Sequence, residues 1–157
     1  MNELIVKEMN RSLAEEILTW KYEPPYDLYN NELNEEGIQE ILTSGYKAVV
    51  NSLDELIGFY CVGNSAQVPV GHQFGVYSES FPDIGIGMMP NLTGKGNGSK
   101  FFTFILKQIQ MEHGLPLRLT VAKFNDRAIR LYEKFGFTKV AEFNNATTEF
   151  ITMVKEN

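Results

Sequence analysis

The sequence predicts an α/β (α+β) fold in which helices flank one mixed sheet. Segments of strand-like alternation and of helical periodicity follow one another along all 157 residues. A strand, a glycine-rich loop and an apolar helix succeed one another over residues 83–113, and another strand follows. The composition, with 43% apolar and 22% charged residues, is that of an ordinary globular protein. The length fits a single domain over residues 1–157.

The first elements are predicted from caps and breakers. A strand is expected at residues 3–9, ELIVKEM, which contain a run of β-forming apolar residues. Ser12 and Glu15 have the spacing of a capping box, so a helix is expected at 13–20. Pro24 and Pro25 are incompatible with its continuation.

A second helix and a hairpin follow. Asn34 is expected to cap a helix at 35–44, because a side-chain oxygen at this position accepts a bond from the first turn. The segments 46–52 and 55–63 are rich in β-formers and flank Leu53 and Asp54, which predicts a hairpin.

The rest of the chain alternates strand and helix after a long irregular segment. The remaining predicted strands are residues 83–89, 115–124, 137–144 and 147–155. The remaining predicted helices are residues 98–113, with Phe101, Phe102, Ile105 and Ile109 near one face, and 125–136, ending at Gly136. The count is six to seven strands and about four helices.

The net charge and the single cysteine argue against several classes of partner and site. A net charge of −6 argues against a nucleic-acid partner. Cys61 is the only cysteine, so no internal disulfide and no cysteine-based metal site is expected, and a reducing compartment is favoured. The start resembles no signal peptide and no apolar run is long enough to span a membrane, so we expect a cytoplasmic protein without metal.

The glycine-rich stretch MMPNLTGKGNGSKFF predicts an anion site. A Walker loop is excluded, because Gly96 follows Lys95 and Met89 stands where that loop requires glycine. The dinucleotide fingerprint fails as well, since Ser99 replaces its last glycine when the pattern starts at Gly94. The loop still joins a strand to a helix start, where unpaired N–H groups and the helix dipole attract phosphate. A plain surface loop is the alternative.

Two motifs resemble those of the GNAT superfamily of acetyl-CoA-dependent N-acetyltransferases. The segment TGKGNG, residues 93–98, is similar to motif A, with Thr93 in place of the usual Arg or Gln. The segment NDRAIRLYEKFGF is similar to motif B, whose matching positions are Asn125, Ala128, Tyr132, Gly136 and Phe137. The strand DIGIGMMP further resembles the branch that contains ribosomal-protein N-terminal acetyltransferases. The implied GNAT-like element order covers nearly the whole chain.

The resemblance implies an acetyl-CoA site. In this family the pantetheine arm lies where the fourth strand separates from the fifth, and Tyr132 would be the general acid toward the coenzyme A thiolate. A core aromatic is the alternative for Tyr132. The positions that the resemblance assigns to acetyl-CoA are Ile86, Gly87, Met88, Met89, Thr93, Gly94, Lys95, Gly96, Asn97, Gly98, Ser99 and Asn125.

The general base is left open between several groups. Thr120 stands where some family members carry a glutamate on the fifth strand, and a threonine cannot take up a proton. Asp83, at the start of a strand and on its glycine face, is the preferred carboxylate. Glu79, His72, Glu23 and a chain of water molecules are its rivals.

The acceptor is expected to be a primary amine, either a small molecule or a peptide N-terminus, that attacks directly in a ternary complex. Tyr22, Glu23, Tyr26 and Tyr29 lie between the first two helices, a region that borders the acceptor pocket in this fold. Without a fifth-strand carboxylate, an amine of low pKa is favoured over a polyamine. The alternative to an enzyme is a coenzyme A-binding sensor or partner-binding module, as a monomer or a homodimer.

Overall fold

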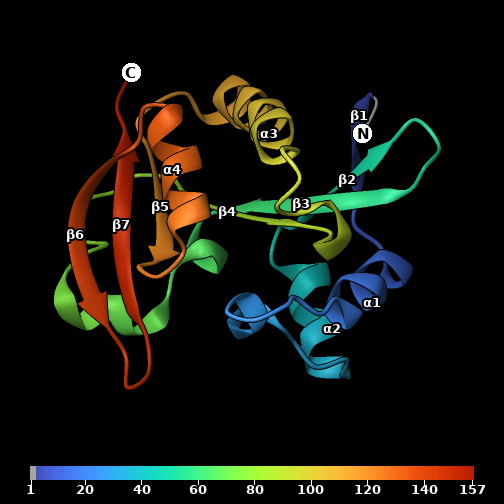
Figure 1. Ribbon diagram of the computed structural model, residues 1–157, viewed down its shortest axis with the longest axis horizontal. Helices are drawn as coiled ribbons and strands as arrows, with labels where there is room; N and C mark the ends of the chain where they lie inside the picture. The colour runs from blue at the N-terminus through green and yellow to red at the C-terminus, as the bar shows by residue number, and fades with distance from the viewer. Residues whose placement is uncertain (1–2) are drawn as a thin grey trace. The chain divides into compact units, whose positions relative to one another are not determined.

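The computed structural model describes residues 3–157 and contains a seven-stranded, mostly antiparallel sheet with strand order β1-β2-β3-β4-β5-β7-β6 (Figure 1). The strands are β1 (Leu4–Glu8), β2 (Lys47–Asn51), β3 (Leu56–Val62), β4 (Asp83–Met88), β5 (Leu117–Ala122), β6 (Thr138–Asn144) and β7 (Glu149–Lys155). The α-helices are α1 (Arg11–Thr19), α2 (Glu35–Thr43), α3 (Gly98–His113) and α4 (Asp126–Lys134). The predicted fold class and element order are confirmed.

The predicted cap of the first helix is wrong. Asn10 caps α1, because its side-chain oxygen accepts a bond of 2.9 Å from the N–H of Leu13. The helix begins at Arg11, so Ser12 lies inside the first turn and does not precede it. The predicted cap of α2 is confirmed, since the side-chain oxygen of Asn34 accepts from the N–H of Gly37 at 2.8 Å.

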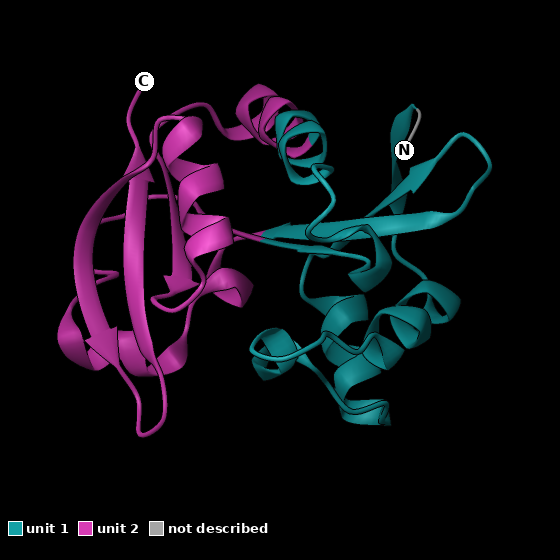
Figure 2. Ribbon diagram, viewed as in Figure 1, with its two compact units in different colours: residues 1–61, 86–104 teal, residues 62–85, 105–157 magenta. Residues whose placement is uncertain are grey.

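The chain divides into two compact units (Figure 2). The first holds residues up to Cys61 together with 86–104. In it α1 and α2 pack on each other and enclose a core with β2 and β3. Its buried side chains are Ala14, Ile17, Leu18, Trp20, Ile38, Ile41, Ala48, Val50 and Leu56.

The start of α3 lies on the other face of β3 within this first unit. A Cβ atom added to Gly58 would lie 2.3 Å from the ring of Phe101, so only glycine lets the helix come this close. Phe59, the next residue, points to the opposite face and packs against the core of α1 and α2. The predicted apolar face of α3 is confirmed, since Phe101, Phe102, Ile105 and Ile109 are all buried.

The second unit holds residues 62–85 and 105–157. Here the beginning of β4 pairs with β5 in parallel, Asp83 opposite Arg118 and Ile84 opposite Leu119. The hairpin β6–β7 extends the sheet through antiparallel pairing of β7 with β5. The predicted irregular segment contains two short 3-10 helices, η2 (Asn64–Ala66) and η3 (Pro69–Phe74). Among the described helices, none is long and apolar enough to cross a membrane.

Candidate functional site

The glycine-rich loop, residues 93–99, connects β4 to α3 and is held by its own side chains. Gly94 and Gly96 have φ values of 71° and 81°, a region that favours glycine. The hydroxyl of Thr93 donates to the carbonyl of Pro90 at 2.7 Å, and the amide of Asn97 donates to the carbonyl of Leu92 at 3.0 Å. Thr93, which replaces the family's usual Arg or Gln, therefore closes the turn that precedes the loop.

The loop has the shape that an anion cradle needs. A Cβ atom added to Gly96 would meet no atom within 4 Å, so open space lies on its outer side. Lys95 is exposed beside it, and Gly98 starts a helix of 16 residues. Free N–H groups and the positive end of the dipole belong to the first turn of such a helix. The loop thus has the features of an anion-binding site.

Residues 86–89, which are the second half of β4 and the residue that follows it, are partly exposed and lie in the same unit as the loop. The N–H of Met89 donates to the carbonyl of Ile57 on β3 at 2.8 Å. A Cβ atom added to Gly87 would lie 2.3 Å from the ring of Phe59. Gly87 therefore lets an aromatic ring lie directly against the strand, and the N–H of Met89 is committed to the sheet.

Tyr22 contacts the same strand, because its hydroxyl donates to the carbonyl of Met88 at 2.8 Å. Its backbone N–H donates to the side-chain oxygen of Asn30 at 2.7 Å, and its ring meets Tyr29 edge-on at 6.4 Å. Burial raises the pKa of Tyr22 to about 12, so the phenol stays protonated at neutral pH. Of the four predicted acceptor residues, Tyr22 is anchored to β4.

The other three predicted acceptor residues lie in or next to a short 3-10 helix. Tyr26 and Tyr29 belong to a short 3-10 helix, η1 (Tyr26–Tyr29), and Glu23 is exposed just before it. The carbonyl of Glu23 accepts a bond of 2.8 Å from the N–H of Tyr26, which starts this turn.

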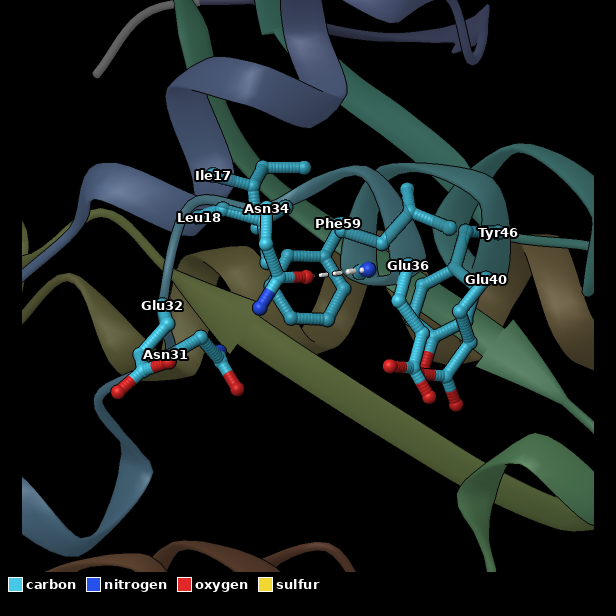
Figure 3. Close-up of a pocket in the computed structure, with 11 residues that line it drawn as sticks. Ile17, Leu18, Asn31, Glu32, Asn34, Glu36, Glu40, Tyr46 and Phe59 are labelled. Atoms are coloured by element: carbon cyan, nitrogen blue, oxygen red, sulfur yellow. Dashed lines mark hydrogen bonds between the residues drawn. The ribbon is translucent and has the colours of Figure 1, made fainter.

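A pocket of about 290 Å³ lies between α1, α2 and β3, all within the first unit. Figure 3 shows the carboxylates of Glu36 and Glu40 beside Tyr46, with Glu32 and Asn31 on the other side of the Phe59 ring. The residues that line the pocket are Ile17, Leu18, Asn31, Glu32, Asn34, Glu36, Gly37, Glu40, Ile41, Tyr46 and Phe59. The lining contains three glutamates and neither lysine nor arginine.

The acidic residues of this pocket were missed by the sequence reasoning. Glu36 and Glu40 are four residues apart on α2, so they share one face of the helix. The neighbouring Glu35 points elsewhere and pairs with Arg11. The i, i+4 spacing was the available signal, but it is equally typical of a solvated helix face.

Asp83, the preferred general base of the sequence analysis, lies in a buried ion pair in the second unit. Its side chain is 3% exposed, and its carboxylate accepts from Nε and Nη2 of Arg118 at 2.6 and 2.8 Å. The amide of Gln67 donates to it as well, at 2.8 Å. The Arg118 guanidinium lies over the rings of Tyr77 and Phe81, at 5.1 and 5.5 Å.

These contacts argue against Asp83 as the general base. Protonation of its carboxylate would leave the guanidinium of Arg118 without its partner in a buried place, which is strongly unfavourable. The same guanidinium donates to the carbonyls of Val76 and Glu79, at 3.3 and 3.0 Å, so it also holds the segment above β5. We therefore do not retain Asp83 as the base.

The motif B residues lie on α4 and at its two ends, in the second unit. Asn125 is 8% exposed, and its side-chain oxygen accepts from the N–H of Ala128 at 3.1 Å, so it caps the helix. Tyr132 is partly buried, and its ring meets Phe137 edge-on at 6.2 Å. The carbonyl of Tyr132 accepts from the N–H of Phe135 and of Phe137, which closes the helix C-terminus. The Tyr132 ring is thereby fixed in place.

The structure thus gathers the predicted residues in two groups. The first unit contains the glycine loop, residues 86–89 and Tyr22. It also contains the pocket between α1 and α2, and the ring of Phe59 both lines this pocket and lies against Gly87. In the second unit are Asp83, Asn125 and Tyr132.

Comparison with known proteins assigns the family. The sequence profile described as the acetyltransferase (GNAT) family matches residues 10–137. The chain belongs to this family. The match includes both the glycine loop and the α4 motif, so the resemblance seen in the sequence is confirmed at the level of the family. No curated protein sequence matches the chain.

Solved structures of other GNAT proteins share the fold of this family member. A chimera of SpeG, the spermidine N-acetyltransferase of Vibrio cholerae, with hSSAT has 20% identity and a TM-score of 0.67, with 98% of this chain and 95% of that chain covered. The aminoglycoside acetyltransferase AAC(6')-Ib in complex with coenzyme A has 15% identity and a TM-score of 0.71, with 99% and 95% covered. A GNAT-family acetyltransferase from Bordetella pertussis has 13% identity and a TM-score of 0.75, with 97% and 95% covered.

Proposed function

We propose that this GNAT acetyltransferase transfers the acetyl group of acetyl-CoA to a primary amine of a small, cationic molecule that carries more than one amino group. The observation that carries this proposal is the position of Phe59. Its ring forms part of the acidic pocket and also lies against Gly87 on β4. The pocket therefore adjoins the strand that we assign to acetyl-pantetheine.

The chemistry of the pocket favours a cation with apolar spacers. Glu32, Glu36 and Glu40 place three carboxylates around it, while no ion pair of Glu36 or Glu40 with a cation occurs in the described part of the chain. The rings of Tyr46 and Phe59 offer faces to which an ammonium group is attracted. Acetyltransferases of spermidine and of aminoglycosides among the structural neighbours support the same class of acceptor.

This substrate class differs from the low-pKa amine that the sequence favoured. An alkylamine with a pKa of about 10.4 must lose its proton at pH 7 at a cost of roughly 4.6 kcal/mol, compared with about 1.4 kcal/mol for an α-amine. A molecule with several amines can leave one ammonium bound to the glutamates while another one loses its proton and reacts. The negative charge of the pocket supports such a molecule with several amines over a single α-amine.

The remaining steps are assigned to residues of this chain. Backbone N–H groups of the glycine loop would bind the pyrophosphate, and holding both reactants in line would supply much of the rate. The neutral amine nitrogen attacks the thioester carbonyl, the carbon–sulfur bond breaks, and Tyr132 would give its proton to the departing thiolate, while the proton that the new amide nitrogen loses would return to the phenolate through solvent. The N–H of Met89 bonds to Ile57, so it is not the donor that stabilises the oxyanion.

The release of coenzyme A thiol from acetyl-CoA tests this proposal. The assay is run without amine and with spermidine, kanamycin, amino-acid amides and peptides with free N-termini, and mass spectrometry identifies the product. We expect spermidine or kanamycin to give the highest kcat/KM. If no amine raises thiol release although the protein binds coenzyme A, the chain is a coenzyme A sensor and the proposal fails.

A further inference from the structure

Phe59 of β3 lies where two parts of the proposed active site meet, and all three belong to the first unit. On one side its ring lines the acidic pocket of α1 and α2. On the other side it covers the α-carbon of Gly87 on β4, since a Cβ atom added there would lie 2.3 and 2.4 Å from two carbon atoms of the ring. The ring therefore occupies the space that a side chain at position 87 would otherwise fill.

Two aromatic neighbours hold the ring of Phe59 in place. The ring of Trp20 stacks on it, with centroids 6.1 Å apart and planes inclined by 27°. The ring of Tyr46, in the wall of the same pocket, has its centroid 5.7 Å away. Both distances lie in the favourable range for aromatic pairs. Phe59 cannot turn away from Gly87 without losing these contacts, so its ring is a fixed boundary of the site.

Gly87 turns its α-carbon toward the side of β4 on which the acidic pocket lies. Side chains alternate along a strand, so Ile86 and Met88 point to the other face. Met89, the residue after the strand, packs against the core that α1 and α2 enclose, as Phe59 does. An amine held in the pocket would approach β4 from this side, and it would meet the strand at the rim of the Phe59 ring.

We propose that Phe59 determines the length of the acyl group that is transferred and that its ring restricts the site to acetyl. This inference rests on the proposed function, in which residues 86–89 hold acetyl-pantetheine. An acetyl carbonyl on β4 within reach of an amine from the pocket has its methyl group beside this ring. A propionyl or butyryl group would add one or two carbon atoms there. The reaction is otherwise the same, since the same carbon–sulfur bond breaks and the same carbon–nitrogen bond forms.

The expected selectivity follows from close packing around the ring. An added methylene group must displace its neighbours, and a ring in contact with two others yields little. Hydrophobic pockets distinguish substrates that differ by one methylene group by about 10- to 200-fold. We therefore expect kcat/KM for acetyl-CoA to exceed that for propionyl-CoA by about 10- to 200-fold, with butyryl-CoA poorer still.

The acyl selectivity of Phe59 variants tests the proposal. The ratio of kcat/KM for acetyl-CoA to kcat/KM for propionyl-CoA is measured with the best amine in the wild type, in Phe59→Leu and in Phe59→Ala. It should fall by about tenfold or more in Phe59→Ala and by less in Phe59→Leu, which keeps part of the volume. The control is Ile38→Ala, which removes apolar volume from the same core but does not line the pocket. It should lower the melting temperature and leave the ratio unchanged.

Calorimetry of acyl-CoA binding tests the role of Phe59 without any turnover. The wild type should bind acetyl-CoA more tightly than butyryl-CoA, and the difference should shrink in Phe59→Ala, or in Phe59→Leu should the alanine variant fail to fold. An unchanged ratio and an unchanged difference in folded variants would overturn the proposal, although turnover by the wild type would still uphold the proposed function. If no amine is acylated but the variants reduce the difference in binding, the role of Phe59 stands and the proposed function fails.

Discussion

The phenol of Tyr22 donates a hydrogen bond of 2.8 Å to the carbonyl oxygen of Met88. This bond joins the segment after α1 to the strand that we assign to acetyl-pantetheine, across 66 positions of sequence. Because burial raises the pKa of Tyr22 to about 12, the donor keeps its proton over the whole neutral range. The hydrogen bond thereby fixes the segment that contains Tyr22 relative to β4 within the first unit.

Replacing this phenol should reduce stability in a pH-dependent way. Tyr22→Phe is expected to lower the free energy of unfolding by about 0.5–1.5 kcal/mol at pH 8, the net worth of one hydrogen bond. In the folded protein the pKa of Tyr22 is about 12, above its ordinary value of 10.0. The contribution of Tyr22 to the free energy of unfolding is therefore fully present below pH 10, and it is lost as the pH rises toward 12. Urea unfolding of both proteins from pH 8 to above pH 10 measures the difference. Equal curves at every pH would contradict the assignment.

The glycine loop can be tested with a matched pair of glycines. Gly96 and Gly45 have φ values of 81° and 78°, and a Cβ atom at either would meet nothing within 4 Å. Alanine at either position should therefore lower stability to a similar extent, about 1–2 kcal/mol, through backbone strain alone. Gly96→Ala should in addition weaken coenzyme A binding, whereas Gly45→Ala should not, and calorimetry compares the two. Equal affinities would show that the loop does not hold the phosphates.

The buried ion pair should matter for stability and not as a base. Asp83→Asn leaves the guanidinium of Arg118 without its partner, so we expect a loss of roughly 3–5 kcal/mol. Asp54→Asn, which breaks the exposed pair with Lys7, should cost less than about 1 kcal/mol. Denaturant unfolding measures both variants. A small effect of Asp83→Asn on stability, together with a lost limb of the pH–rate profile, would return Asp83 to the role of base.

Tyr132→Phe should separate chemistry from binding. The ring keeps its contact with Phe137, so the melting temperature and the affinity for acetyl-CoA are expected to stay close to those of the wild type. Turnover should fall by about 10²- to 10⁴-fold if the phenol protonates the thiolate. Single-turnover measurements report the chemical step itself. An unchanged rate there would leave Tyr132 with a packing role.

Local signals in the sequence predicted most of the fold, and long-range pairs account for what they missed. The Asn34 cap, the apolar face of α3 and the order of helices and strands along the chain depend on residues a few positions apart, and they are confirmed. The sequence favoured Asp83 as the base because nothing in the local sequence reveals its ion pair with Arg118, which lies 35 positions away.

The acidic pocket could not be predicted from the local sequence for the same reason. Glu36 and Glu40 look like a solvated helix face until the fold places Phe59 of β3 beside them. Side chains of this kind acquire a role only from neighbours that the chain brings together by folding.

The most direct test compares two acceptors in two variants of α2. The ratio of kcat/KM for spermidine to kcat/KM for a neutral peptide with a free N-terminus is measured in the wild type, in the double variant Glu36→Gln/Glu40→Gln and in Glu35→Gln. Glu35 is the control, because it neighbours Glu36 but pairs with Arg11 outside the pocket. An ion pair near the surface is worth about 0.2–1 kcal/mol, so two pairs are worth about 0.4–2 kcal/mol, and the ratio should fall roughly 2- to 30-fold in the double variant and stay constant in the control. A ratio that favours the peptide in the wild type, or that is the same in all three proteins, would contradict the proposal that this acetyltransferase selects a cationic amine through the acidic pocket.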